Sequence, residues 1–372
     1  MKKILTLSLV ALALSCCTPS VKLIPRKAFQ GEVEGVPIDL YTLKSENLTV
    51  QITNFGARVV SLYTPDKDGN WADIVVGHDN LQAYVAPPGE RFLGATVGPV
   101  ANRIGNAAFQ VEGETWHTDA NDNGVNTLHG GFKGIDMRPW TVESSSATSL
   151  TLSLECPNGQ DGFPGNRTIT LTYSVSDADF KVEIEANSNK ITPFNITHHP
   201  FFCLRGEGEG TVEDYLMTIH ASAYTPVDSL SIPTGEIVPV EGTPFDFRKP
   251  HAIGQYINEE NKQLRFGHGY DHNWCLDGDG MRTACKVQDP VSGRTIEVIT
   301  DQPGLQFYSG NFFNGGEAGK NGKPLGFRSS LVLEAQGWPD AVNHPNFPSS
   351  LILPEETYRS ITIYRFGVKW QD

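Results

Sequence analysis

The sequence predicts an all-β protein built as one large antiparallel β-sandwich, and three observations support this fold class. Hydrophobic residues recur at every second position in many short runs, which is the period of a strand with one buried face. Clusters of turn-forming residues separate these runs, and the chain has 37 glycines and 24 prolines to supply them. No linker, repeat or change of composition divides the 372 residues, so we expect one unit.

Four runs along the chain carry the alternation most clearly. Leu48, Val50 and Ile52 alternate with polar residues first, and three later runs follow the same pattern: 150–154, 169–175 and 180–184. Three clusters predict turns between strands: 66–70, 162–165 and 289–293. The best candidate for a helix is short and covers 253–262.

The start of the chain has the pattern of an export signal. Lys2 and Lys3 precede an apolar stretch, 4–14, that is too short to span a bilayer. The tetrapeptide Ala-Leu-Ser-Cys that follows at 13–16 resembles a bacterial lipoprotein box, whose cysteine becomes the lipidated first residue. We therefore predict a signal peptide over 1–16 and a protein of the bacterial cell envelope, a periplasmic lipoprotein anchored at Cys16. A buried N-terminal helix or strand is the alternative.

The net charge and the cysteine spacing limit the kinds of ligand and metal that we expect the protein to bind. The net charge of −14 becomes −16 when the two lysines leave with the signal, which argues against nucleic acid and suits a neutral small molecule. Four cysteines remain and show no CxxC spacing, so we expect no zinc site: Cys156, Cys203, Cys275 and Cys285. We expect free buried thiols, although Cys275 and Cys285 would face each other if a hairpin centred on 277–280.

Several strand-like segments carry polar residues where a simple sandwich needs none. The run LVLEAQ at 331–336 places Glu334 on one face with two neighbours and an apolar trio on the other. Taken alone, a solvated face explains this carboxylate better than a buried one, because buried glutamates are rare without a partner. Asp271 shares a face with Asn273 in the run that starts there. Both carboxylates are therefore candidates for a site.

Two further segments attract attention for the same reason. Asn102 and Arg103 lie between apolar residues and glycines, and His129 is followed by Gly130 and Gly131. The two glycines predict a turn that lets a ligand approach the backbone.

The adjacent residues His198 and His199 pose a question about geometry. Both lie in the strand-like segment PFNITHHPFF. Because successive side chains of a strand point to opposite faces, only one of the two can serve a given site.

The segment 119–124 matches the first half of a calcium-binding loop, but the match fails at its end. Gly130 stands at the twelfth position, where a bidentate glutamate is required. We expect an ordinary turn here, although a structural Ca²⁺ ion elsewhere stays open.

Six segments, in this order and at these spacings, resemble the aldose 1-epimerases, or galactose mutarotases: VANRIGNAAF, NGVNTLHGG, NITHHPFF, GYDHNW, QPGLQFYSGNF and LVLEAQGWPDAVNHPNFPS. Each segment alone is a weak match, whereas six in order are a strong one. The resemblance runs from about residue 28 to the C-terminus and implies one domain over 28–372. It also implies a β-sandwich of the galactose mutarotase type, which agrees with the alternation described above.

The resemblance assigns roles to individual residues. It places the general acid at His199 and the general base at Glu334. It implies that His198 and Phe201 depart from the family pattern, which usually has asparagine and tyrosine there, so Phe201 brings no hydroxyl to the sugar. Cys203 likewise stands where the family has asparagine. The residues that would hold the sugar, besides Phe201, are Asn102, Arg103, His129, Asp271 and Gln306.

The implied reaction is the interconversion of the α and β anomers of hexoses such as D-glucose and D-galactose. A base removes the proton of the C1 hydroxyl while an acid protonates the ring oxygen, and closure reverses these roles. The chemistry needs no cofactor, and we expect a monomer that binds an aldohexose. Imidazole is suited because its ordinary pKa of ~6.5 leaves both forms present near neutral pH.

Two alternatives come from other classes of protein. A glycosidase would use Glu334 and Asp271 as its two carboxyl groups. A non-catalytic sugar-binding lipoprotein would keep the groups that hold the sugar without needing the pair Glu334 and His199.

Overall fold

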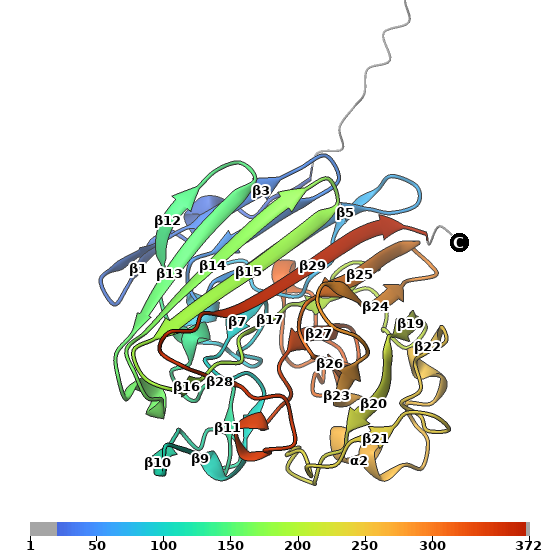
Figure 1. The fold of residues 1–372 in the computed structure, drawn as a ribbon. Coiled ribbons are helices and arrows are strands. Elements are labelled where there is room, and N and C mark those ends of the chain that lie inside the picture. The colour runs from blue at the N-terminus through green and yellow to red at the C-terminus, as the bar shows by residue number, and fades with distance from the viewer. Residues whose placement is uncertain (1–20, 370–372) are drawn as a thin grey trace, which may run out of the picture.

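The computed structural model describes residues 21–369, and its largest element is a nine-stranded antiparallel sheet (Figure 1). In spatial order its strands are β12 (Thr141–Ser145), β13 (Ser149–Cys156), β14 (Arg167–Ser176), β15 (Asp179–Ser188), β29 (Tyr358–Val368), β25 (Arg294–Thr300), β24 (Arg282–Gln288), β19 (Leu216–Ile219) and β22 (His251–Ala252). The predicted signal peptide over 1–16 and the anchor at Cys16 lie outside the described residues.

A six-stranded antiparallel sheet lies beneath the nine-stranded one in Figure 1 and carries most of the polar residues singled out above. Its strands, in spatial order, are β18 (Phe201–Phe202), β27 (Leu331–Gln336), β26 (Gly304–Tyr308), β23 (Asp271–Leu276), β20 (Ala221–Thr225) and β21 (Val238–Pro239). Its register sets Gln306 opposite Glu334 and Tyr308 opposite Asp271, so the long strands present these side chains in neighbouring rows.

Smaller sheets complete the structure. A four-stranded sheet contains β3 (Leu40–Lys44), β4 (Thr49–Thr53), β5 (Arg58–Pro65) and β6 (Trp71–Asp73). Five pairs of short strands are β1 (Gly31–Val33) with β2 (Val36–Ile38), β7 (Ala95–Val97) with β17 (Thr197–His199), β8 (Arg103–Ile104) with β11 (Thr127–Leu128), β9 (Ala108–Val111) with β10 (Glu114–His117), and β16 (Thr192–Pro193) with β28 (Leu351–Ile352).

Helices are short throughout the described residues. The two α-helices are α1 (Gln82–Val85) and α2 (Lys262–Gly267). Seven 3₁₀ turns cover Arg26–Ala28, Gly105–Ala107, Ile135–Met137, Gln160–Gly162, Ile253–Gln255, Lys320–Gly322 and Ala341–Asn343. None of the helices in 21–369 is long and apolar enough to cross a membrane.

The core lies between the sheets, and strand alternation explains which side chains enter it. In β14 every second residue is buried, from Arg167 to Val175, while the residues between them are exposed or half-buried. One hydrophobic cluster joins Leu171 of this strand to Leu305 and Leu333 of the six-stranded sheet. The apolar face of the six-stranded sheet therefore packs on the nine-stranded sheet, which leaves its polar face for a site.

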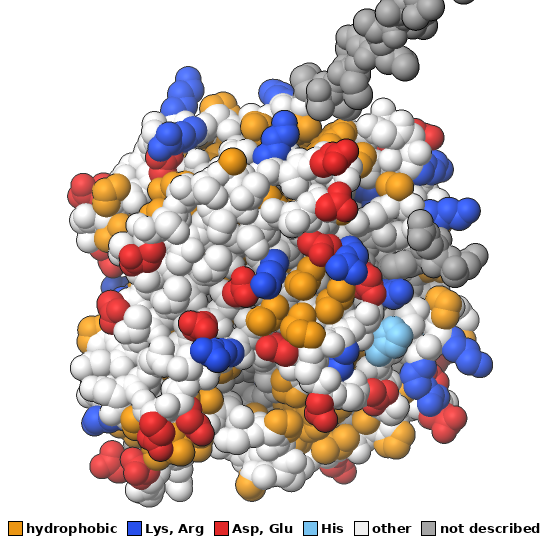
Figure 2. Space-filling model, turned by 45° about the horizontal axis from the view of Figure 1, so that its top comes forward, with side chains coloured by type: hydrophobic (Ala, Val, Ile, Leu, Met, Phe, Trp, Pro, Cys, Tyr) orange, Lys and Arg blue, Asp and Glu red, His pale blue; other side chains and the backbone are white. Residues whose placement is uncertain are grey.

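The opposite face of the nine-stranded sheet points to solvent. Acidic and basic side chains lie interspersed on the face drawn in Figure 2. Two ion pairs across β15 and β29 contribute to this pattern, Arg365 with Asp179 and Arg359 with Glu185. This distribution is typical of a surface exposed to water.

The predicted all-β class, the four alternating runs and the three turns are confirmed. The runs correspond to β4, β13, β14 and β15, and the turns lie between consecutive strands. The helix expected over 253–262 is wrong, because only a 3₁₀ turn and the first residue of α2 form within it. Asn261 ends that stretch by accepting hydrogen bonds from the backbone of Gln263 and Leu264 as the N-cap of α2.

The four cysteines between 21 and 369 are free and buried, as expected. The hairpin that would bring Cys275 and Cys285 together is not formed. Cys275 lies in β23 of the six-stranded sheet and Cys285 in β24 of the nine-stranded sheet, so the chain crosses between sheets at this point.

Candidate active site

Glu334 occupies the polar face of the six-stranded sheet. Leu333 and its alternate neighbours on β27 point into the core, so Glu334 must point the other way. It is nevertheless 2% exposed, because the short strand pairs and their loops cover this face. The expectation of a solvated face from the sequence alone is therefore wrong, and the carboxylate lies in a buried polar site.

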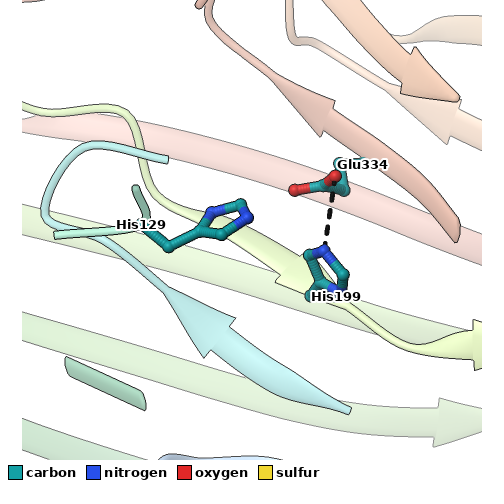
Figure 3. A group of neighbouring side chains, drawn as sticks. All are labelled: His129, His199 and Glu334. Carbon is teal, nitrogen blue, oxygen red and sulfur yellow. Dashed lines mark ion pairs between the residues drawn. The ribbon is translucent and has the colours of Figure 1, made fainter. Parts of the chain in front are cut away.

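His199 reaches the same place from β17, which pairs with β7 through His199 and Ala95. Its Nε2 atom lies 3.6 Å from Oε1 of Glu334, and Figure 3 shows the two side chains pointing toward each other. This separation is too long for a hydrogen bond. The two groups are thus close neighbours that do not hydrogen-bond to each other directly.

His198 points to the opposite side of the strand, as the alternation predicts. Its ring packs among three aromatic side chains of the core, Tyr173, Phe180 and Tyr364, at centroid distances of 5.6 to 5.9 Å. Neither ring nitrogen has a hydrogen-bond partner among the described residues. His198 is therefore a core residue and does not line the site.

His129 completes a group of three side chains (Figure 3). Its ring is perpendicular to that of His199, with centroids 5.2 Å apart. The backbone of His129 is left-handed, with φ 50°. At Gly130, with φ +86°, a Cβ atom would lie 2.0 Å from the carbonyl oxygen of Gly98. Gly130 thus allows two backbone segments to approach each other, rather than a ligand to approach the backbone.

A backbone hydrogen bond fixes the tautomer of His129. Its Nδ1 accepts a hydrogen bond from the backbone N–H of Asn102 at 3.1 Å. The backbone N–H of His129 donates in return to the carbonyl of Asn102. Burial keeps the ring neutral by holding its pKa well below the ordinary value. The hydrogen of the neutral ring must therefore be on Nε2, which makes His129 a hydrogen-bond donor toward the site.

The three side chains also have the composition of a metal site. Their ligand atoms all lie within 4.8 Å of one another, and two histidines with one glutamate form catalytic zinc sites in other proteins. The tautomer of His129 opposes this use. To bind a metal through Nε2, the ring would have to place its hydrogen on Nδ1 and lose the bond from Asn102. The geometry thus favours a donor over a ligand.

Burial shifts both members of the central pair toward their neutral forms. The pKa of Glu334 lies well above its ordinary value because of burial first and the charge of Asp271 second. Burial lowers the pKa of His199 to about 3. This disagrees with the expectation that the imidazole titrates near its ordinary pKa of ~6.5. A protonated Glu334 beside a neutral His199 is the favoured form.

Asp271 lies at the start of β23, beside the central pair. Its Oδ1 accepts a hydrogen bond from Nε2 of Gln306 at 2.7 Å, while Oε1 of that amide has no protein partner in the described chain. Burial raises the pKa of Asp271, and the guanidinium of Arg103 opposes the shift. Asp271 and Gln306 together present oxygens to donors such as sugar hydroxyls.

Asn102 and Arg103 enter the site at the beginning of β8, whose first residue is Arg103. Arg103 donates from Nε to Oδ2 of Asp122 at 2.9 Å, which orients its guanidinium. Asn102 adopts a left-handed conformation, with φ 57°, and its backbone makes the two hydrogen bonds to His129. Asp122 belongs to the segment rejected as a calcium loop, and the structure confirms a turn there, closed by backbone bonds to Asn126.

Phe201 forms part of the apolar lining. Its ring lies 5.1 Å from that of His199 and makes an edge contact with Tyr308. All of the residues that the sequence assigned to the site therefore surround one region. They come from β8, β11, β17, β18, β23, β26 and β27 or the loops beside them.

One segment that borders the site, 86–93, was not predicted from the sequence; it is called the wall below. Phe92 makes an edge contact with His129 at a centroid distance of 4.6 Å and lies 5.9 Å from His199. Glu90 precedes it and also adds to the raised pKa of Glu334. The segment is irregular and carries no alternation, so nothing in its pattern marked it.

Comparison with known proteins points to one family. The family model described as Aldose 1-epimerase matches residues 39–365. The galactose mutarotase of Rattus norvegicus is 40% identical over 335 residues, which is 90% of this chain and 95% of that protein. The aldose 1-epimerase of Escherichia coli K12 is 34% identical over 339 residues, covering 90% of this chain and 96% of that one.

Solved structures agree with the sequence matches. A GalM/aldose epimerase homologue from C. elegans superimposes with a TM-score of 0.82 at 26% identity, covering 89% of this chain and 99% of that one. A galactose 1-epimerase from Lactobacillus acidophilus superimposes with a TM-score of 0.79 at 26% identity, covering 92% and 98%.

Proposed function

Because this chain belongs to the aldose 1-epimerase family and is an isomerase that interconverts the anomers of hexoses, we propose that Glu334 and His199 carry its two proton transfers. The observation that supports this assignment best is the 3.6 Å separation of Glu334 Oε1 and His199 Nε2. The C1 hydroxyl and the ring oxygen of a pyranose are bonded to the same carbon, so two groups this close can address both oxygens at once.

Ring opening uses the pair in its charged form. Glu334 takes the proton of the C1 hydroxyl as the C1–O5 bond breaks, and protonated His199 delivers a proton to O5. The aldehyde then rotates about C1–C2. Closure on the other face returns the proton of Glu334 to O1, while His199 recovers its proton from O5.

One proton shared by the pair serves the whole cycle. Before opening, the proton is on His199, and in the open-chain state it is on Glu334. Burial favours the second arrangement, since it raises the pKa of Glu334 and lowers that of His199 to about 3. The environment of the pair therefore suits the protonation state that accompanies the open chain, and the pair titrates as a unit.

The surrounding groups hold the sugar. Asp271 accepts hydrogen bonds from hydroxyls, and Gln306 adds a free acceptor next to it. Arg103 and the Nε2–H group of His129 donate to sugar oxygens near the reacting carbon. Asn102 keeps His129 in its donor tautomer, and Phe201 lines the site without offering a hydroxyl.

A glycosidase and a non-catalytic sugar-binding protein account for fewer features of the site. A glycosidase needs an acid and a base or nucleophile on either side of a glycosidic bond, and His199 beside Glu334 has no role in it. A sugar-binding protein would have no use for a carboxyl group and an imidazole both shifted toward neutrality by burial. The family to which the chain belongs favours neither.

Polarimetry of freshly dissolved α-D-galactose and α-D-glucose tests the proposed activity. The protein should accelerate the approach to the anomeric equilibrium of both sugars, and it should release no nitrophenol from nitrophenyl galactosides or glucosides. Release of nitrophenol would favour the glycosidase. Saturable sugar binding with an unchanged rate of mutarotation would favour the binding protein.

The cycle needs no metal or organic cofactor, since the two side chains supply and accept every proton that ring opening and closure move. One chain supplies all of the groups, which supports a monomer acting on an aldohexose. Dialysis against EDTA should leave kcat unchanged within error. A loss of activity that Zn²⁺ or Ca²⁺ restores would contradict a metal-free cycle.

The enzyme works in the bacterial cell envelope as a lipoprotein. The lipoprotein box that ends at Cys16 supports this location. The first described residues are secured to the four-stranded sheet, where Gln51 exchanges two hydrogen bonds with the backbone of Ile24. A lipid anchor at Cys16 would thus be separated from the folded body by only a few residues.

A further inference from the structure

The irregular segment 86–93 forms a wall of the site beside His199. Phe92 projects from it against His129 and His199. The buried guanidinium of Arg58 donates from Nη1 to the carbonyl oxygens of Arg91 and Leu93, at 2.7 and 3.1 Å. The wall is therefore fixed on both sides of Phe92.

Glu90 is held in this wall by backbone contacts. Its Oε1 accepts a hydrogen bond from the backbone N–H of Phe92 at 2.8 Å, and its own N–H donates to Oε2 of Glu317 at 2.9 Å. The neighbouring cation is engaged elsewhere, since Arg91 forms two 2.7 Å bonds with Asp136. Within 21–369, Glu90 is a half-buried carboxyl group without an ion-pair partner, and its second oxygen makes no hydrogen bond there.

Glu90 lies beside the site, because its carboxyl group holds the backbone of Phe92, whose ring contacts His129 and His199. Its charge contributes to the raised pKa of Glu334 and to that of Tyr308, both of which lie on the polar face of the six-stranded sheet. Burial also raises the pKa of Glu90 itself. A carboxyl group with one oxygen tied to Phe92 and the other free is suited to a hydroxyl ligand.

The structure of the pyranose ring indicates which sugar hydroxyl would reach Glu90. The ring oxygen joins C1 to C5, and C5 carries the hydroxymethyl group of a hexose. If Glu334 addresses O1 and His199 addresses O5, the hydroxymethyl group lies beyond His199, on the side away from Glu334. The rings next to His199, besides His129, are Phe92 and Phe201, and neither offers a polar group.

We propose that the free oxygen of Glu90 accepts a hydrogen bond from the 6-hydroxyl of the aldohexose and thereby favours hexoses over sugars that lack this group. The proposal rests on the proposed function, because it takes the orientation of the sugar from the roles of Glu334 and His199. Glu90 thus determines specificity for sugars that carry a 6-hydroxyl, and it takes no part in proton transfer.

A double-mutant cycle between protein and sugar tests the proposal. Saturation kinetics of mutarotation are measured for wild type and Glu90→Ala with D-galactose and with D-fucose, its 6-deoxy analogue. In the wild type, removal of the 6-hydroxyl should raise KM ~10-fold, the effect of one hydrogen bond to a carboxyl group. In Glu90→Ala the two sugars should have the same KM within about twofold, with kcat little changed.

Two control variants distinguish the loss of a hydrogen bond to the 6-hydroxyl from a general loosening of the segment 86–93. Glu90→Gln keeps an oxygen for the backbone of Phe92 and a polar group for the hydroxyl, so it should restore most of the preference for D-galactose. Gln82→Ala, at an exposed position of α1 just before the wall, should leave the preference unchanged. The thermal midpoints of all variants report whether they fold.

The outcomes are distinct. Equal losses for D-galactose and D-fucose in Glu90→Ala, with the tenfold preference intact, would overturn the assignment of Glu90 to the 6-hydroxyl while leaving the epimerase activity in place. An absence of mutarotation by the wild type with either sugar would overturn the proposed function, and the role of Glu90 with it.

Discussion

At the scale of single residues, the buried pair of Glu334 and His199 determines the pH dependence of the enzyme. The pair works with one proton, so activity falls when it gains a second or loses its last. The second proton must go to His199, whose pKa is about 3, and the last leaves Glu334, whose pKa is raised. Both shifts widen the active range.

We therefore expect the acidic limb of kcat/KM to lie well below pH ~6.5, the ordinary pKa of histidine, and the alkaline limb well above ~4.3, that of glutamate. Polarimetry across this range, corrected for mutarotation catalysed by buffer, gives the profile. An acidic limb centred near pH 6.5 would contradict the neutral His199.

A second prediction concerns the adjacent residues His198 and His199. His199→Gln should lower kcat by about 10²–10⁴-fold, the usual effect of losing an acid–base group. His198→Asn is its matched control, because His198 packs among core aromatics and touches no site residue through its ring nitrogens. It should lower the midpoint of thermal unfolding but keep kcat within a few fold. Comparable losses of kcat in the two variants would refute the alternation argument.

The residues of the site were predictable to different degrees. Glu334, Asp271 and His199 lie in regular strands or at their ends, and a family pattern marks them. Glu90 and Phe92 lie in an irregular wall, and Asp122 lies in a turn, so neither alternation nor spacing indicates that they reach the site. The pKa shifts also escaped prediction, because they depend on burial by loops far away in the chain.

At the scale of elements, one buried cation supports the wall of the site. Arg58 of β5 is fully buried and makes hydrogen bonds to Arg91, Leu93 and Asp136. Its loss would leave these carbonyl oxygens without a donor. Arg58 thus connects β5 of the four-stranded sheet to the segment that carries Phe92.

We expect Arg58→Lys to lower the free energy of unfolding by ~1–3 kcal/mol for each buried carbonyl oxygen that the lysine leaves without a donor. KM should rise as the wall loosens. Urea unfolding and saturation kinetics measure the two effects. Arg248→Lys is the control at a partly exposed position, where Arg248 forms a bidentate pair with Asp246. Equal stability of the two variants would contradict the structural role of Arg58.

The positions of the strands were predicted better than the pairing between strands. The alternation in β14 and β15 follows directly from one buried face, and the turns are encoded by local residues. The crossing of the chain between β23 and β24 was not predicted, because a hairpin and a crossing require the same turn residues. The helix expected over 253–262 failed for a related reason, since its pattern gave no account of the cap at Asn261.

At the scale of the whole molecule, the all-β class followed from the sequence, whereas the division into a nine-stranded, a six-stranded and a four-stranded sheet did not. Alternation says which face of a strand is buried but not which strand lies beside it. The order of the sheets decides that β17, β27, β26 and β23 meet. The site therefore depends on contacts between segments far apart in the chain.

The N-terminus gives a prediction at this scale. Expressed in a bacterial host with lipoprotein processing, the chain should be cleaved before Cys16 and carry lipid on that residue. Mass spectrometry of the N-terminal peptide and partition into detergent test this, with Cys16→Ser as the unlipidated control. An intact Met1, or an unmodified N-terminus beyond Cys17, would contradict the anchor.

The division of labour between two carboxyl groups decides whether Glu334 is the base. Exchange of magnetisation between the α and β anomers of D-galactose, at saturating sugar, should be lost in Glu334→Gln by about 10²–10⁴-fold, while saturation-transfer difference spectra still report binding. Asp271→Asn should raise KM as well as lower kcat, because a poorly held ring misplaces C1. If Glu334→Gln exchanged the anomers at nearly the wild-type rate while Asp271→Asn bound the sugar and exchanged none, the base would be Asp271 and not Glu334.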